Sequence, residues 1–120
     1  MPVKNVELTS IEARRFSRPQ ERIMQVRVDH NSTVTVVREA GPQEANIEFR
    51  YTASYGGVGI IRLEGQITFA CDAMAITKQW SETAQMPSDM ASEVHTTVMR
   101  VCVPEAVGIA KNLKLPLPIP

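Results

Sequence analysis

Apolar residues occupy every second position on both sides of a diglycine, Gly56-Gly57, between residues 47 and 69. This period of two is typical of a strand that has one buried face and one solvated face. Two such runs separated by a glycine turn predict an antiparallel β-hairpin. The positions that share a face are Ile47, Phe49, Tyr51, Ala53 and Tyr55 before the diglycine, and Ile61, Leu63, Gly65, Ile67 and Phe69 after it.

The odd numbering of both sets also predicts the register of the hairpin. Partners across a hairpin share a face, so their residue numbers must sum to an even total. A two-residue loop would pair Tyr51 with Arg62 and drive a charge into the core, whereas a loop of odd length, or a bulge at Gly59, avoids this. In that register the Phe49 ring can lie over the bare backbone of Gly65. The predicted pairs are Ala53 with Ile61, Tyr51 with Leu63, and Phe49 with Gly65.

The residues before the hairpin predict two more strands. Residues 6–13 alternate with one slip of phase, which a bulge near Thr9-Ser10 would explain. Residues 24–28 alternate again, and after a bend or bulge at residues 30–32 the β-branched residues 33–37 continue the extended chain. Gly41-Pro42 then predicts a turn. Residues 1–71 therefore predict one antiparallel sheet.

The last third of the chain has helical character. Asp72 can cap a short helix that runs to Trp80, and residues 86–89 break this helix and start a second one. Pro104 predicts a kink or break near residues 100–103 of the second helix. The alternating prolines after Lys114 favour an extended polyproline-like tail with free carbonyl groups. The second helix has an apolar stripe formed by Met90, Val94, Val98, Cys102, Ala106, Ile109 and Leu113.

We therefore expect a single α+β domain that comprises residues 1–120. It contains a four-stranded antiparallel sheet in residues 1–71, helices packed on one face of the sheet in residues 72–113, and a proline-rich tail in residues 114–120. Val37, Val58 and Ile60 are out of phase with the core positions. They predict a partly apolar outer face of the sheet, which favours a homo-oligomer.

Charge and composition argue against several classes of partner. Thirteen basic and thirteen acidic residues cancel, so no global field favours nucleic acid or a membrane surface. No signal peptide opens the sequence, and no apolar run reaches the roughly 20 residues of a membrane-spanning helix. Cys71 and Cys102 lie in apolar surroundings, which is typical of reduced, buried thiols. We expect a cytoplasmic protein that does not insert into membranes.

Groups that could carry catalysis are scarce. Neither His30 nor His95 has a carboxylate at ligand-like spacing, and the two cysteines lack the spacing of metal ligands. The glycines at residues 56–59 join two strands and do not open a helix, so they do not predict a phosphate site. The arginines of residues 14–22, with acidic neighbours, favour a solvated loop over a nucleic-acid footprint. We expect no catalytic residue, no metal and no cofactor.

The apolar residues around the helix break suggest a binding groove. Methionine side chains are flexible and polarizable, so a surface that contains them accepts many apolar shapes. The alternative is that these methionines fill gaps beneath the helix. The predicted groove residues are Met74, Ile76, Trp80, Met86 and Met90.

The segment from Tyr55 to Gly65, Tyr-Gly-Gly-Val-Gly-Ile-Ile-Arg-Leu-Glu-Gly, resembles the glycine-centred hairpin of the export chaperone SecB. Trp80, the Met86-Pro87 break, Cys102 and the ending from residue 110 resemble the small archaeal SecB-like proteins still more closely. The resemblance implies a four-stranded sheet with helices on one side that assembles into dimers or tetramers. It also implies a holdase, a chaperone that keeps unfolded polypeptides soluble without nucleotide. A proline-rich end stands in place of the acidic, metal-binding tail through which SecB docks on the export motor, so the resemblance implies the chaperone activity more directly than an export role.

The sequence thus favours a SecB-like holdase whose partners are unfolded or nascent polypeptides. A second hypothesis is a non-catalytic structural subunit whose apolar surfaces bind a fixed partner. A third is a small-molecule binding protein or enzyme that uses a cleft between subunits near His95 or Arg62. The first two differ in promiscuity, because a holdase protects several unrelated unfolded proteins and a structural subunit protects none.

Overall fold

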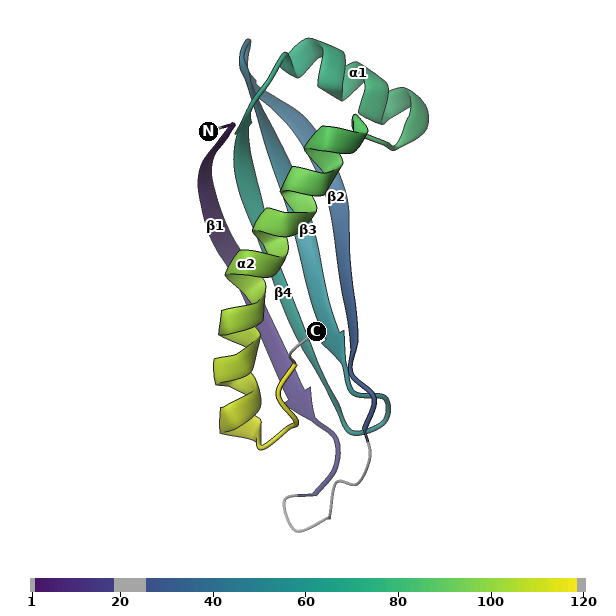
Figure 1. Cartoon of the computed structure of the whole chain (residues 1–120), viewed down its shortest axis with the longest axis vertical. Coiled ribbons are helices and arrows are strands. Elements are labelled where there is room, and N and C mark those ends of the chain that lie inside the picture. Colours follow the sequence, from purple (N-terminus) through teal and green to yellow (C-terminus); the bar gives the residue numbers. More distant parts are fainter. Residues whose placement is uncertain (1, 19–25, 119–120) are drawn as a thin grey trace.

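The computed structural model of the chain describes residues 2–18 and 26–118. It has an α+β fold in which one four-stranded antiparallel sheet is followed by two helices, and both helices lie on one face of the sheet (Figure 1). The strand order is β1-β4-β3-β2, so that β1 and β2 are the edge strands. The predicted fold class is confirmed. The elements are β1 (Val3–Arg15), β2 (Asp29–Gly41), β3 (Glu44–Ser54), β4 (Gly59–Ala70), α1 (Ala73–Thr83) and α2 (Ser88–Leu113).

The central hairpin has the register that its sequence predicts. Tyr51 pairs with Leu63, and Phe49 pairs with Gly65. The loop has odd length, because the Tyr55 N–H donates to the Gly59 carbonyl at 3.0 Å and residues 56–58 lie between them. Gly56 has φ 62°, a left-handed conformation that glycine adopts without a Cβ clash. Of the two predicted alternatives, the loop of odd length is therefore present and the bulge at Gly59 is not. The odd loop keeps the apolar side chains of both strands on one face.

Gly65 is needed where three strands meet. A Cβ atom at this position would lie 2.8 Å from Cζ of Phe49 and still closer to the backbone carbonyl oxygen of Glu7. The predicted contact between the Phe49 ring and the glycine backbone is therefore present. No larger residue fits there without moving the backbone of β1.

Bulges adjust the phase of both edge strands. The register of β1 shifts between Leu8 and Ser10, which confirms the predicted bulge. The register of β2 shifts between Val34 and Val36, later than the predicted bend at residues 30–32. This shift turns Val37 to the core face, where it is buried opposite Ile47. The prediction that Val37 belongs to the outer face was wrong.

The strand predicted at residues 24–28 is wrong for the described part of that range. Val26 and Val28 lie outside any strand, and β2 begins at Asp29, while Met24 falls outside the described residues. The partner strand explains this boundary. Asp29 pairs with Ser54, the last residue of β3, so no described strand lies beside residues 26–28 with which they could form a ladder.

Helix α1 begins as its sequence predicts. The Asp72 side chain accepts a hydrogen bond from the Ala75 N–H at 3.3 Å, and the helix ends at Ala84 in the left-handed conformation. Helix α2 follows Pro87 and carries Asp89 in its first turn, where a negative charge favours the helix dipole.

Helix α2 contains Pro104 without a break. Of the predicted kink or break near residues 100–103, the break is absent, because one continuous helix spans Ser88–Leu113, and its axis bends as it crosses the sheet (Figure 1). Proline removes the hydrogen bond to the carbonyl four residues earlier, that of Arg100. Arg100 is exposed, so water can solvate that carbonyl.

The core lies between α2 and the inner face of the sheet. The predicted stripe on α2 is buried from Met90 to Ala106, and it continues through Ala110, while Ile109 and Leu113 are only partly buried. The strand residues beneath α2 are the alternating apolar positions of the hairpin. The buried side chains of β3 and β4 are Ala45, Ile47, Phe49, Tyr51, Ala53, Ile61, Leu63, Ile67 and Phe69.

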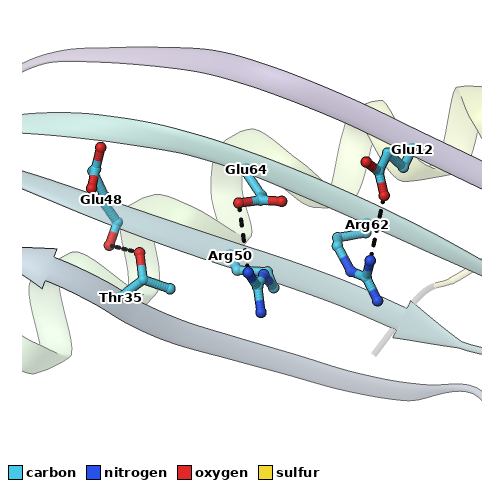
Figure 2. A network of polar contacts seen from close by, with 6 residues as sticks. All are labelled: Glu12, Thr35, Glu48, Arg50, Arg62 and Glu64. Atoms are coloured by element: carbon cyan, nitrogen blue, oxygen red, sulfur yellow. Dashed lines mark hydrogen bonds and ion pairs between the residues drawn. The ribbon is translucent and has the colours of Figure 1, made fainter.

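The outer face of the sheet carries polar pairs between neighbouring strands (Figure 2). Arg50 faces Glu64 at 3.8 Å, Arg62 faces Glu12 at 3.4 Å, and both pairs are direct cross-strand partners. Such partly exposed ion pairs stabilise a fold by less than about 1 kcal/mol each. The charges keep this face solvated, although the half-buried Ile60 interrupts them.

Candidate functional site

A hollow of about 430 Å³ lies where the two helices meet the edge strand β2. We call it the Trp80 hollow. The end of α1, the connection to α2 and the start of α2 form its helical wall, and β2 forms the opposite wall. Its lining residues are Ser32, Thr33, Val34, Trp80, Ala84, Gln85, Met86 and Ala91.

The connection between the helices shapes this hollow. The Ala84 N–H donates to the Trp80 carbonyl at 2.8 Å, and the left-handed conformation of Ala84 ends α1. Pro87 follows within three residues and starts α2. This short turn brings Trp80 and Met86 to the same side of the connection, above β2.

The hollow borders backbone groups that have no strand partner among the described residues. Strand β2 pairs with β3 along one side, and no described strand pairs with its other side. An edge strand presents a row of N–H and C=O groups that can pair with another extended chain. The Trp80 hollow therefore combines apolar side chains with an open sheet edge.

The structure brings together two of the five predicted groove residues. Trp80 and Met86 line the Trp80 hollow. Ile76 packs against the core, Met90 is buried in it with 6% of its surface exposed, and Met74 is 72% exposed outside the hollow. Sequence reasoning missed Ser32, Thr33 and Val34, because only the pairing of the sheet and the packing of α1 place β2 beside Trp80.

The chain after α2 folds back onto the inner face of the sheet (Figure 1). We call residues 115–118 the tail. The side chain of Leu115 is 5% exposed and that of Pro118 is fully buried. The Tyr55 hydroxyl donates a hydrogen bond to the Pro116 carbonyl oxygen at 2.7 Å. The tail lies outside any helix or strand, and the Pro116 carbonyl, which was predicted to be free, accepts this hydrogen bond.

The end of α2 is held by β1. Nη1 of Arg15 donates to the Leu113 carbonyl oxygen at 3.1 Å, and the Leu115 N–H donates to the Ala110 carbonyl at 2.9 Å. These bonds satisfy carbonyls that a helix end otherwise leaves open. They also direct the tail toward Tyr55.

Burial disfavours the ionised form of the nucleophiles in the core. Burial raises the pKa of the Cys102 thiol to about 12, and Glu105 adds to the effect. Burial also raises the pKa of Tyr51 to about 12, and its hydroxyl lies 2.7 Å from Nδ1 of His30. Cys71 has a raised pKa for the same main reason. All three groups are neutral at physiological pH, and a neutral thiol is a poor nucleophile.

Two further observations bear on other classes of function. Within residues 2–18 and 26–118, no three His, Cys, Asp or Glu side chains lie close enough together to hold a metal ion. In the same part of the chain, no helix has the length and apolar character needed to cross a membrane.

Arg62, which the third hypothesis named, lines a separate hollow of about 360 Å³ on the outer face. Its guanidinium is engaged by Glu12 at 3.4 Å, and Phe16 and Ile60 contribute apolar surface. His95 is exposed on α2 and does not line this hollow. The two residues of that hypothesis therefore do not share a site within one subunit.

Comparison with protein-family models, with curated proteins and with solved structures finds no match to this chain.

Proposed function

We propose that this protein is a non-catalytic chaperone of the holdase type that binds extended, apolar segments of unfolded or nascent polypeptides. The observation that carries the proposal is the position of the Trp80 hollow beside the edge of β2 with which no described strand pairs. The resemblance to SecB in the hairpin and in the helical part supports the same proposal, and with it a cytoplasmic location.

The two walls of the hollow supply complementary interactions. An added strand on β2 would form main-chain hydrogen bonds that do not depend on the client sequence, as in other cases of β-strand addition. Trp80 and Met86 would bury apolar side chains of the client, at about 25 cal/mol per Å² of apolar surface. Methionine adapts to different shapes, so this combination suits many unrelated segments.

Assembly into a dimer or tetramer is part of the proposal. Strand β1 is the second edge of the sheet, and Ile11 remains 56% exposed although it pairs with Leu63 on the core face. A second copy of the chain against β1 would cover this side chain and pair the open edge.

An aggregation-suppression assay tests the function. The wild-type protein, in near-stoichiometric amounts, should keep several unrelated unfolded proteins soluble without nucleotide. Met86→Ser should reduce this protection at least several-fold, whereas Met74→Ser should change it little, because only Met86 lines the hollow. Circular dichroism and sedimentation would show that both variants keep their fold and assembly.

Two results would reject the proposal. Equal protection by Met86→Ser and wild type would remove the hollow from the mechanism. Absence of protection for every client would favour the second hypothesis, a structural subunit with a fixed partner.

A further inference from the structure

We propose that the inner face of the sheet beside the glycine loop is a second binding site for extended polypeptide segments, and that the tail occupies it as an internal ligand. We call this the tail site and define it by Arg15, Tyr55 and Gly59. The inference rests on the proposed function, because it assigns an additional surface to the same kind of client. The ligand class is an apolar segment in the polyproline conformation.

The first anchor is the space beside Gly59 that the Leu115 side chain fills. A Cβ atom at Gly59 would lie 3.2 Å from both δ-methyl carbons of Leu115 and 2.7 Å from the backbone oxygen of Arg14. The absence of a side chain at Gly59 therefore leaves the space that the leucine fills. Leu115 is 5% exposed in this space.

The second anchor is a backbone contact that does not depend on the side chain of the ligand. The Tyr55 hydroxyl donates to the Pro116 carbonyl oxygen at 2.7 Å, while the Tyr55 ring is itself buried. Proline has no N–H, so its carbonyl is the one backbone group through which it can form a hydrogen bond. A buried tyrosine hydroxyl needs a partner, and any segment with a carbonyl at this position supplies one.

The spacing of buried residues defines the conformation that the site accepts. Leu115 and Pro118 are buried, whereas Leu117 between them is 45% exposed. A polyproline helix has three residues per turn, so residues i and i+3 share one face. The site therefore selects apolar side chains at i and i+3 and a carbonyl at i+1. Proline-rich segments suit it because their conformation is already restricted before binding.

The tail is a replaceable occupant of this face. Helix α2 already covers the centre of the sheet through the buried residues from Met90 to Ala110. The tail joins α2 through Lys114, whose left-handed conformation with φ 54° is part of the helix C-cap and does not depend on the tail. Release of the tail would leave Tyr55 free to bind a carbonyl of another chain.

Competition with the tail sets the concentration at which an added segment binds. A tethered segment on a short linker has an effective concentration of about 1 mM. A free peptide with the sequence of residues 114–119, Lys-Leu-Pro-Leu-Pro-Ile, has the same contacts available, so it should displace half of the tail near about 1 mM. Substitutions that weaken binding of the tail should lower this concentration, because the tail site is then vacant in a larger fraction of the protein.

The experiment uses this hexapeptide, blocked at both ends and carrying a fluorophore, with the full-length chain. Fluorescence anisotropy should show at least tenfold tighter binding to the double variant Leu115→Ser, Pro118→Ser than to wild type. Adding Tyr55→Phe to that variant should weaken binding several-fold. A control peptide with serine in place of its first leucine should bind at least tenfold more weakly. Circular dichroism confirms that each variant is folded.

A second measurement covers the case in which the double variant does not fold. A spin label on Leu117→Cys, in a Cys71→Ser background, reports the mobility of the tail in an otherwise intact chain. The hexapeptide should increase that mobility with a midpoint near about 1 mM, and the serine control peptide should not. Unchanged mobility up to ten times that concentration would overturn the inference, as would equal binding of the hexapeptide by the folded double variant and wild type.

The two proposals fail in different ways. If the protein suppresses aggregation but the hexapeptide neither binds nor displaces the tail, the tail site is rejected and the proposed function stands. If the hexapeptide displaces the tail but the protein protects no client, the tail site is supported as a peptide site and the holdase is rejected.

Discussion

The Tyr55 hydroxyl and the Pro116 carbonyl oxygen are joined by a 2.7 Å hydrogen bond that spans 61 residues of sequence. It ties the end of the central hairpin to the segment that follows the last helix. Both the position of the tail and the shape of the tail site depend on this contact.

Tyr55→Phe should lower the free energy of unfolding by about 1–2 kcal/mol, because it removes one hydrogen bond and leaves the Pro116 carbonyl without this donor. Urea denaturation of the full chain measures the difference. If the tail contributes nothing to the fold, the unfolding midpoint of the variant will equal that of wild type. Introducing Leu117→Ser should have little effect, because this side chain is 45% exposed.

Gly65→Ala should destabilise the fold by about 3 kcal/mol or more, because the added methyl group overlaps the backbone of β1 and the ring of Phe49. Gly108→Ala provides a matched control with the same chemical change. Nothing lies within 4 Å of its added Cβ, and alanine in a helix should stabilise by about 0.5–1 kcal/mol. Thermal denaturation of the two variants should give shifts of opposite sign, and similar shifts would contradict the packing described for Gly65.

Stability should fall in alkaline solution because Cys102 and Tyr51 ionise at a lower pH in the unfolded chain than in the folded protein. The pKa of Cys102 is raised from 9.0, and that of Tyr51 from 10.0, to about 12 in each case. Because the folded-state pKa is the higher one, the contribution of each group is complete below its unfolded pKa and is lost as the pH rises toward 12. The loss should be about 1.4 kcal/mol per pH unit for each group within its window.

Unfolding free energies measured between pH 8 and pH 11 test this prediction. Cys102→Ala should remove the decrease in unfolding free energy that begins near pH 9. Tyr51→Phe should remove the decrease that begins near pH 10. If the unfolding free energy changes with pH in the same way in wild type and in both variants, neither group has a raised pKa in the folded protein.

Met90 and Met86 should respond differently to truncation. Met90→Ala should destabilise the fold by about 2–4 kcal/mol, since the side chain is 6% exposed and its loss leaves a cavity. Met86→Ala should destabilise by only about 1 kcal/mol, because Met86 is half-buried at the Trp80 hollow. Chemical denaturation of the two variants provides the comparison, and equal losses would place both residues in the core.

Much of the sheet could be predicted because its signals are local. Alternation around Gly56-Gly57 specifies which residues share a face, and the parity of the two runs then allows only registers such as Tyr51 with Leu63. The slip at Thr9 and the cap at Asp72 are likewise visible within a few residues of the feature that they control.

The candidate sites were less predictable. Trp80 and Met86 stood out by residue type, but their partners on β2 are about fifty residues away in sequence, and no local pattern links them. The same limit applies to Met90, whose spacing fits a surface groove and a core equally well until the path of α2 over the sheet is known.

The sequence alone determined the hairpin register and the capped helix, because periodicity and side-chain capping act within a few residues. Only the tertiary structure decided that no described strand pairs with residues 26–28, that Val37 turns inward, and that Pro116 contacts Tyr55. These outcomes depend on which distant segments lie side by side. The free energy of that packing arises from contacts between segments, so no single segment of the sequence reveals it.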